Sequence, residues 1–102
     1  MINISFIIPV FNEEQTIKKV ILDIQKKCSE TQEIAEYEIL IIDDNSKDRS
    51  QKIISEFKEV KYFKNLNNFG YGFSLKKGIK NANFSNIVIL DGDGTYPVES
   101  LD

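Results

Sequence analysis

The 102-residue sequence contains no histidine, no tryptophan and only one cysteine, Cys28. A single cysteine cannot form an internal disulfide or a cysteine cage for zinc. Without histidine, Ser-His and Cys-His catalysis within this chain are excluded as well. Any chemistry must therefore come from carboxylates, lysine, tyrosine, backbone amides or a metal held by oxygen atoms.

Other absences narrow the class of protein. No apolar run approaches the roughly 20 residues of a membrane-spanning helix. No basic segment precedes the first apolar run, as it would in a secretory signal, so we expect a cytoplasmic location. Lys+Arg total 13 against 16 for Asp+Glu, a net charge of −3 that disfavours a dedicated nucleic-acid binder. With 41% hydrophobic and 28% charged residues, the composition predicts one soluble globular domain.

Apolar runs of strand length alternate with helical patterns along the chain. We expect strands at residues 4–11, 37–42, 60–63 and 86–90, and runs apolar on both faces are typical of buried parallel strands. After the first strand, Asn12 and Gln15 have the spacing of a helix capping box. The helix that follows is predicted to bury one stripe of side chains: Ile17, Val20, Ile21, Ile24 and Cys28. Residues 29–36 are polar and are expected to connect it to the second strand.

Three further helices are expected. Ser46 or Asp48 should cap the second helix. The third should run to about Ala82 with Leu75 and Ile79 facing inward, and the fourth should begin after Pro97. The βαβαβαβ pattern predicts an α/β fold, a parallel sheet with helices on both faces. We expect the strand order 3-2-1-4, because it gathers the acidic strand ends around the switch point between the first and fourth strands.

Carboxylates follow three of the four predicted strands. They are Glu13, Asp43, Asp44, Asp91 and Asp93. Ligands of open parallel sheets bind beyond the carboxyl ends of the strands, and carboxylates gathered there repel one another unless a cation lies among them. Oxygen ligands suit Mg²⁺ or Mn²⁺, and Mg²⁺ combines one or two carboxylates with substrate phosphates. The sequence therefore predicts a metal bound jointly with a phosphorylated ligand.

The Asp91-Gly92-Asp93 triplet is the sharpest of these signals. In an extended segment, residues i and i+2 point the same way, and glycine allows a ligand to approach closely. A simple Asp-Gly turn is the alternative, but the place of the triplet after a buried strand favours a site. Of Asp43 and Asp44, we expect one to cap or brace the chain and the other to face the ligand.

The segment from Lys64 to Lys80 carries four lysines and no acidic residue in an otherwise acidic chain. Such a positive region suits a diphosphate, although a solvated helix face is the alternative, and for Lys80 the preferred one. The glycines of this segment do not form a dinucleotide-binding motif, because Leu75 stands where the third glycine is required.

Four segments in order, residues 4–13, 39–48, 67–79 and 89–97, resemble the N-terminal half of a family 2 glycosyltransferase with the GT-A fold. The nearest subgroup is the polyprenol-phosphate (dolichol-phosphate) sugar synthases. The resemblance implies that residues 1–102 are the Rossmann-like, nucleotide-sugar-binding half of that fold, truncated at the C-terminus. The catalytic base, the acceptor site and any membrane anchor would then lie beyond Asp102.

The resemblance also implies roles for individual residues. Asp91 and Asp93 match the family's Asp-x-Asp motif, which binds Mg²⁺ or Mn²⁺. The implied reaction is inverting transfer of a sugar from a nucleoside diphosphate sugar, with a polyprenyl phosphate at the membrane surface as a candidate acceptor. The residues implied in nucleotide-sugar binding are Pro9, Phe11 and Glu13 around the base and ribose, Asp43 or Asp44 on the base, the segment from Gly70 to Lys77 near the ribose and diphosphate, and Asp91 and Asp93.

Three other functions stay open on the residues alone. Asp43, Asp44 and Asp91 are placed much as the acidic pair and phosphorylated aspartate of a phosphoacceptor receiver domain, although residues 1–36 would then be an extra βα unit. A non-catalytic nucleotide-binding module is the second alternative. A sugar nucleotidyltransferase is the third, weakened by the lack of an early glycine-rich loop with arginine. For the chain alone we expect no transferase activity, an uncovered outer edge on the fourth strand, and either self-association or marginal stability.

Overall fold

The computed structural model of the protein describes residues 1–93. Its elements are β1 (Ile2–Val10), α1 (Ile17–Glu30), β2 (Ile34–Asp43), α2 (Ser50–Ser55), β3 (Lys61–Lys64), α3 (Tyr71–Asn81) and β4 (Asn86–Ile89). All strand pairs are parallel, and the order β3-β2-β1-β4 confirms the prediction. Within residues 1–93, β3 and β4 are the two edges of the sheet. The helix predicted after Pro97 lies outside the described residues.

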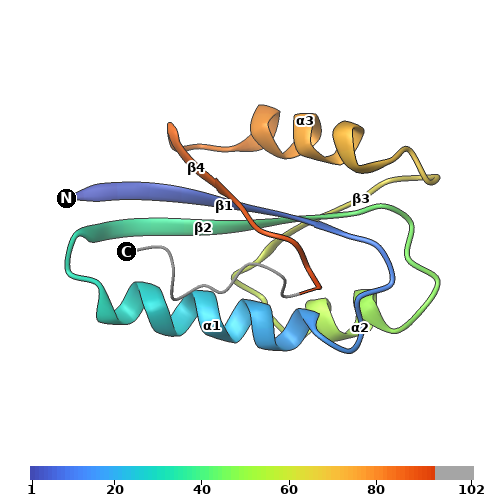
Figure 1. The fold of residues 1–102 in the computed structure, drawn as a ribbon, viewed down its shortest axis with the longest axis horizontal. Coiled ribbons are helices and arrows are strands. Elements are labelled where there is room, and N and C mark those ends of the chain that lie inside the picture. Colours follow the sequence, from blue (N-terminus) through green and yellow to red (C-terminus); the bar gives the residue numbers. More distant parts are fainter. Residues whose placement is uncertain (94–102) are drawn as a thin grey trace.

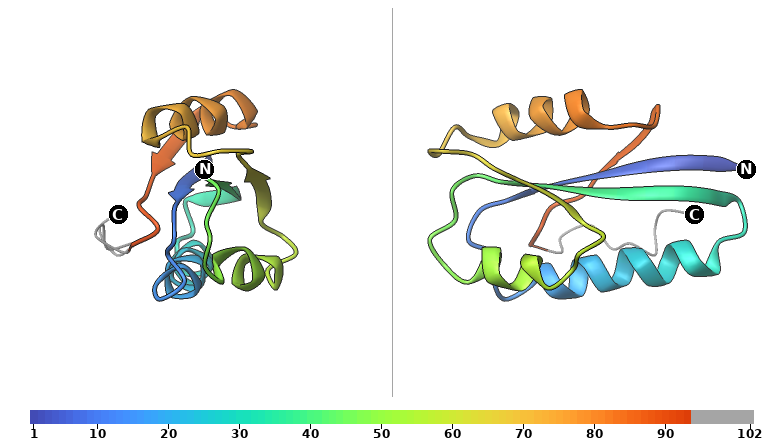
Figure 2. Two further views of the ribbon diagram at one scale, coloured as in Figure 1. Left: turned by 90° about the vertical axis from the view of Figure 1, so that its right-hand side faces the viewer. Right: turned by 180° about the vertical axis from the view of Figure 1, so that it is seen from behind.

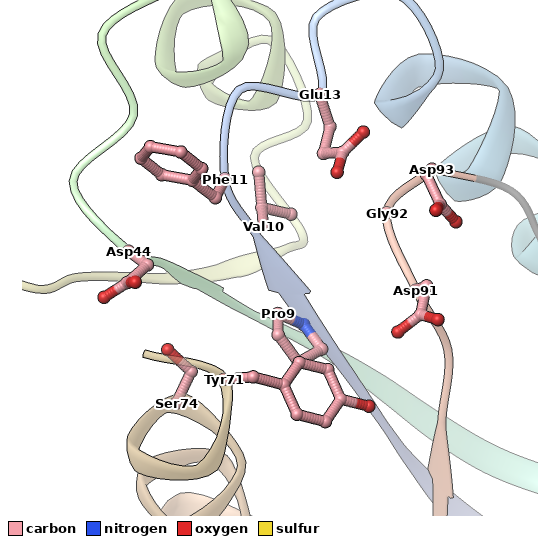
Figure 3. Close-up of a pocket in the computed structure, with 10 residues that line it drawn as sticks. All are labelled: Pro9, Val10, Phe11, Glu13, Asp44, Tyr71, Ser74, Asp91, Gly92 and Asp93. Carbon is pink, nitrogen blue, oxygen red and sulfur yellow. The ribbon is translucent and has the colours of Figure 1, made fainter. Parts of the chain in front are cut away.

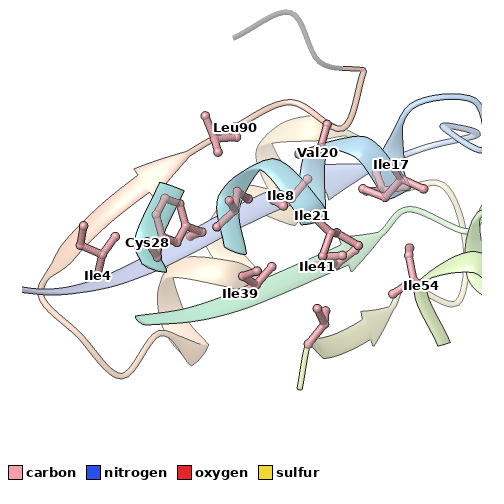
Figure 4. Close-up of a cluster of buried hydrophobic side chains, with 14 residues drawn as sticks. Ile4, Ile8, Ile17, Val20, Ile21, Cys28, Ile39, Ile41, Ile54 and Leu90 are labelled. Atoms are coloured by element: carbon pink, nitrogen blue, oxygen red, sulfur yellow. The ribbon is translucent and has the colours of Figure 1, made fainter. Parts of the chain in front are cut away.

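Helices cover both faces of the sheet, as expected. The helices α1 and α2 lie on one face and α3 on the other (Figures 1 and 2). The larger core lies under α1, where the predicted stripe of that helix packs on alternate strand residues such as Ile8 and Ile41 (Figure 4). The smaller core lies under α3 and contains Ile7, Leu40 and Ile42. Because β1 and β2 bury both faces, they read as continuous apolar runs.

Two small residues set the distance between α3 and the sheet. Ser74 and Gly78 are the buried residues of this helix, and a Cβ on Gly78 would lie 2.5 Å from Ile7 Cγ2. The prediction that Ile79 faces inward is wrong, since its side chain is 47% exposed, whereas Leu75 packs against the smaller core. At Gly78 the helix lies so close to the sheet that a side chain there would collide with Ile7 and Ile42.

The predicted start of the first helix is also wrong. Thr16, not Asn12, precedes α1, and it makes no capping hydrogen bond with its side chain. Asn12 lies in the left-handed region at φ 55°, and its side-chain oxygen accepts a 2.8 Å hydrogen bond from the Lys47 N–H. Asn12 thus connects two loops instead of capping a helix.

The second helix begins later than expected. It starts at Ser50, and the Asp48 carboxylate accepts a 2.9 Å hydrogen bond from the Ser50 N–H. Asp48 therefore satisfies a donor at the start of α2, while the Ser46 hydroxyl accepts from the Asn12 N–H. The predicted polar connection at 29–36 is too long, because α1 continues to Glu30 and β2 begins at Ile34.

A buried acid, Glu38, organises the face of the sheet that α3 covers. Its carboxylate accepts hydrogen bonds from Ser5 Oγ at 2.6 Å, Lys61 Nζ at 2.5 Å, Asn83 N at 2.6 Å and Asn83 Nδ2 at 2.9 Å. Ser5 Oγ in turn accepts from the Phe84 N–H. This group, the Glu38 cluster (Ser5, Glu38, Lys61, Asn83 and Phe84), ties three strands to the segment between α3 and β4.

None of the helices within residues 1–93 combines the length and the apolar character needed to cross a membrane.

Candidate functional site

A pocket of 420 Å³ opens at the carboxyl ends of β1, β2 and β4 (Figure 3). Ten residues line it: Pro9, Val10, Phe11, Glu13, Asp44, Tyr71, Ser74, Asp91, Gly92 and Asp93. Six of them were predicted as site residues from the sequence: Pro9, Phe11, Glu13, Asp44, Asp91 and Asp93. Tyr71 and Ser74 belong to the segment from Gly70 to Lys77 that the family resemblance implied near the ribose and diphosphate, whereas Val10 was not singled out. The strand order thus brings together residues that are up to 84 positions apart in the chain.

The loops after β1 and β2 are joined by hydrogen bonds that fix one wall of the pocket. The backbone N–H groups of residues 12–14 donate to Ser46 Oγ, Ser50 Oγ and Asp48 Oδ2 at 2.9, 2.9 and 3.1 Å. Three consecutive amides held in this way leave the β1–α1 loop little freedom. The side chains of Phe11 and Glu13 are therefore held at the pocket.

Asp43 does not line the pocket. It is fully buried at the end of β2, where its carboxylate accepts hydrogen bonds from Tyr62 Oη at 2.5 Å and from the Ser46 N–H at 2.8 Å. Burial raises the pKa of the Tyr62 hydroxyl, and the hydrogen bond to Asp43 raises it further. Asp43 is thus the bracing member of the acidic pair.

Asp44 is the member of the pair that faces the pocket. Its carboxylate accepts hydrogen bonds from Asn65 Nδ2 at 2.9 Å, the Phe69 N–H at 2.8 Å and the Gly70 N–H at 3.0 Å. Burial raises the pKa of Asp44, but these hydrogen bonds outweigh burial and the net pKa lies below its usual value. Asp44 is therefore ionised and oriented before any ligand arrives.

Asn65 is a residue that the sequence did not reveal. It is 1% exposed, and its amide nitrogen donates both to Asp44 and to Ser74 Oγ, the latter at 3.1 Å. Its amide oxygen accepts a 3.1 Å hydrogen bond from Lys77 Nζ. One signal could have found it, because Asn65 directly follows β3 and so lies at the same sheet edge as the strand-end acids.

Gly70 and Lys77, which were predicted to contact the ligand, do not line the pocket in this structure. Gly70 has φ 95°, a conformation that favours glycine, and its N–H holds Asp44. Lys77 holds Asn65. Both residues support the wall of the pocket from behind.

The Asp91-Gly92-Asp93 triplet packs tightly against the β1–α1 loop. The Gly92 carbonyl accepts a 2.6 Å hydrogen bond from Thr16 Oγ1. A Cβ on Gly92 would lie 3.1 Å from Val10 Cγ2 and 3.3 Å from Glu13 Cγ, so a larger residue would require these side chains to shift. Figure 3 shows the carboxylates of Glu13, Asp91 and Asp93 on one side of the pocket and that of Asp44 on the other.

The carboxylates on this side of the pocket carry the same charge and repel one another. The pKa of Glu13 is raised by burial and then by the negative charges of Asp93, Asp48 and Asp91. Within residues 1–93, no three acidic, cysteine or histidine side chains converge closely enough to hold a metal by themselves. Asp91 and Asp93 could hold a divalent cation as a pair, with phosphate oxygens completing its coordination.

Comparison with known sequences gives one family. The chain matches the family described as "Glycosyl transferase family 2" over residues 5–102. An uncharacterized glycosyltransferase of Bacillus subtilis, YkcC, is 33% identical over 98% of this chain and 32% of its own length. The undecaprenyl-phosphate 4-deoxy-4-formamido-L-arabinose transferase of Proteus mirabilis is 27% identical over 96% of this chain and 31% of its own. The chain thus spans about a third of the length of these curated relatives.

Solved structures show the same fold. TarS (residues 1–349) of S. aureus in complex with UDP-GlcNAc superposes with a TM-score of 0.76 and 22% identity, covering 89% of this chain and 26% of TarS. The mannosyltransferase PcManGT of Pyrobaculum calidifontis in complex with GDP-Man and Mn2+ superposes with a TM-score of 0.76 and 19% identity, covering 88% of this chain and 27% of that enzyme. The four-stranded sheet is therefore that of a GT-A glycosyltransferase, as the sequence predicted.

Proposed function

The chain belongs to glycosyl transferase family 2, and on that premise we propose that it forms the nucleotide-sugar-binding part of a glycosyltransferase. The observation that carries the proposal is the strand-end pocket. It combines aromatic walls, an oriented carboxylate at Asp44 and an acidic pair at Asp91 and Asp93. A nucleoside diphosphate sugar needs these surfaces: a flat wall and a hydrogen-bond acceptor for its base, and a metal site for its diphosphate.

The walls of the pocket suit the base and the ribose. Phe11 and Tyr71 border it with rings that are 43% and 55% exposed. Exposed aromatic faces offer a flat surface on which a base can stack. Asp44 keeps acceptor capacity on its carboxylate beside this surface, so it can accept a hydrogen bond from a base N–H.

Asp91 and Asp93 are the residues that would hold Mg²⁺ or Mn²⁺. A divalent cation bound there would offset the charge that develops on the diphosphate as it leaves the sugar. The Glu13 N–H donates a hydrogen bond to Ser50 Oγ, and the pKa of the Glu13 carboxyl is raised first by burial and then by the negative charges of Asp93, Asp48 and Asp91. A cation relieves this repulsion, which favours metal and diphosphate binding together.

The sugar acceptor and the catalytic base are further parts of the proposal. A polyprenyl phosphate acceptor is supported by the name of the Proteus mirabilis relative, an undecaprenyl-phosphate transferase. The family resemblance supports inversion at the sugar and a catalytic base beyond Asp102. We therefore expect the 102-residue chain to bind nucleotide without transferring sugar to a polyprenyl phosphate.

The phosphoacceptor alternative fits the structure less well. A receiver site would need Asp43, Asp44 and Asp91 to face one metal, but the Asp43 carboxylate is buried against Tyr62 and Ser46, outside the pocket.

Calorimetric titration with UDP and with GDP, each with and without Mn²⁺, tests the proposal. We expect binding that is stronger with Mn²⁺, and loss of the metal-dependent part in Asp93→Asn. Asp23→Asn on α1 is the matched control, because it removes one carboxylate remote from the pocket and should leave the titration unchanged. Equal nucleotide affinity with and without Mn²⁺, or an unaffected Asp93→Asn variant, would show that Asp93 is not a metal ligand.

A further inference from the structure

The outward side of α3 and the loop before it expose an unusual set of side chains. Phe73 and Ile79 are each 47% exposed and Phe69 is 50% exposed. The rings of Phe69 and Phe73 pack together with their centroids 4.7 Å apart. Lys76 and Lys80 extend from the same side of the helix. We call this surface the α3 outer face (Phe69, Phe73, Lys76, Ile79 and Lys80).

The charged residues of the segment that forms this face are all positive. The sequence has five lysines and no acidic residue between Glu59 and Asp91, although the whole chain carries a net charge of −3. Lys61 forms an ion pair with Glu38, and Lys77 donates a hydrogen bond to Asn65. Within residues 1–93, neither Lys76 nor Lys80 forms an ion pair. Phe73, Lys76, Lys77 and Lys80 line a shallow groove of 500 Å³.

The helix on the other side of the sheet lacks this character. In α1, the exposed lysines Lys18 and Lys26 alternate with Asp23 and Glu30, and Lys19 forms an ion pair with Asp23. Its exposed large apolar residue is Leu22. Mixed charges with a single exposed leucine are typical of a solvated helix face.

We propose that the α3 outer face docks on an anionic lipid surface. The two phenylalanine rings and Ile79 would enter the boundary between headgroups and acyl chains, and Lys76 and Lys80 would contact headgroup phosphates. Lysine stems can lie along apolar surface while their ammonium groups reach the charged plane, which suits this alternation of apolar and basic residues. A two-fold contact between copies through the same face would instead oppose lysine to lysine.

The α3 outer face belongs to the same helix as part of the pocket, so docking would affect where the pocket lies. Tyr71 and Ser74, at the start of α3, line the strand-end pocket (Figure 3). A helix that rests on a bilayer by its outer face would hold the pocket next to the lipid headgroups. A lipid-linked phosphate acceptor would then approach the pocket from the bilayer, and this link to the acceptor rests on the proposed function. The docking itself is independent of the proposed function.

Cosedimentation of the chain with vesicles tests the docking without any nucleotide. We expect binding to vesicles of phosphatidylcholine with phosphatidylglycerol, weaker binding at higher salt, and little binding to phosphatidylcholine alone. Each basic residue near an anionic surface strengthens binding roughly fivefold, so the double variant K76E/K80E should bind about 25-fold more weakly or worse. The control K18E/K26E makes the same change in net charge on α1 and should retain most of the binding.

A second pair of variants separates apolar insertion from charge. Ile79→Ser should weaken vesicle binding severalfold, whereas Leu22→Ser, which removes a similarly exposed aliphatic side chain from α1, should not. Equal binding to both kinds of vesicle, or an equal loss in K76E/K80E and K18E/K26E, would overturn the proposal.

Light scattering without lipid checks the other possible occupant of this face. A dimer that Ile79→Ser disperses would show that a second copy covers the face, and this result would also overturn lipid docking. The nucleotide titrations are a separate readout, so the docking can fail while metal-dependent nucleotide binding stands, and the reverse.

Discussion

Glu38 and Glu13 both lie at least partly out of water, yet the protein surrounds them in opposite ways. Burial raises the pKa of Glu38, but hydrogen bonds from Lys61, Ser5 and Asn83 outweigh it and lower the pKa to about 2. Burial also raises the pKa of Glu13, and there the charges of Asp93, Asp48 and Asp91 raise it further. The first carboxylate is surrounded by donors and the second by other acids.

This difference separates a structural acid from a ligand site. The Glu38 cluster contains its own countercharge and donors, so nothing from outside is needed to stabilise it. Around Glu13, the negative charges of Asp93, Asp48 and Asp91 disfavour the ionised carboxylate, so we expect a cation beside them to relieve that repulsion. Asp44 lies between these cases, because it faces the pocket but is held by Asn65 and two backbone amides.

Removal of Glu38 should have the largest effect on stability. In Glu38→Ala, Lys61 loses its partner and the donors of Ser5 and Asn83 are left without an acceptor. We expect the free energy of unfolding to fall by about 3–5 kcal/mol, as measured by urea denaturation. Glu36→Ala, in the exposed first part of the same strand, is the control and should change it by less than about 0.5 kcal/mol. A similarly small effect for Glu38→Ala would mean that the cluster is not a structural centre.

The same carboxylate predicts a dependence of stability on pH. Because folding lowers the pKa of Glu38 from 4.5 to about 2, its contribution is fully present above pH 4.5 and is lost as the pH falls toward 2. The loss should be on the order of 3 kcal/mol. Glu38→Gln keeps the shape but cannot titrate, so urea denaturation should show the wild-type advantage shrinking between pH 4.5 and 2. An advantage that stays constant over this range would contradict the lowered pKa.

Asn65→Ala tests the support of Asp44, the pocket carboxylate that is held by hydrogen bonds within the protein. The change removes the amide donor to Asp44 and Ser74 and leaves the Lys77 ammonium without its acceptor. We expect a loss of about 2 kcal/mol in the free energy of unfolding and weaker nucleotide binding, because Asp44 is less well oriented. Asn68→Ala, in the exposed loop nearby, should change neither quantity, and an equal effect of both variants would place Asn65 outside the support of the pocket.

The sheet and most of the pocket could be predicted from local patterns. The strands β1 and β2 are apolar on both faces, which indicates burial between helices. The acids at their ends and at the end of β4 then suggest the order that brings them together. Asp44, Asp91 and Asp93 could be placed in the pocket because each lies within a few residues of the end of a strand, so its position depends mainly on the sheet.

The missed features depend on partners far away in the sequence. Asn12 was predicted to be a helix cap, but its side-chain oxygen accepts a hydrogen bond from the N–H of Lys47, which lies 35 residues later. Glu38 appeared to be one polar residue in a strand, since its partner Asn83 lies 45 residues away. Ile79 was misplaced because the closest approach of α3 to the sheet is at Gly78, where Ile7 and Ile42 leave no room for a side chain, and Ile79 lies on the exposed side of the helix. Periodicity in the sequence carries no information about such contacts.

Glu13→Gln should have the smallest effect, and one of opposite sign. A raised pKa means that folding disfavours the ionised form, so at neutral pH the charge of Glu13 lowers stability. Glutamine removes the charge and keeps the shape, and we expect the free energy of unfolding to rise by up to about 1 kcal/mol in the absence of divalent cations. Glu36→Gln, which is exposed and lies on β2, should not show this gain. Addition of Mn²⁺ with UDP or GDP should reduce the advantage of Glu13→Gln, because a cation offsets the same repulsion. A loss of stability in Glu13→Gln without metal would mean that the pocket, like the Glu38 cluster, already contains the interactions its acids need.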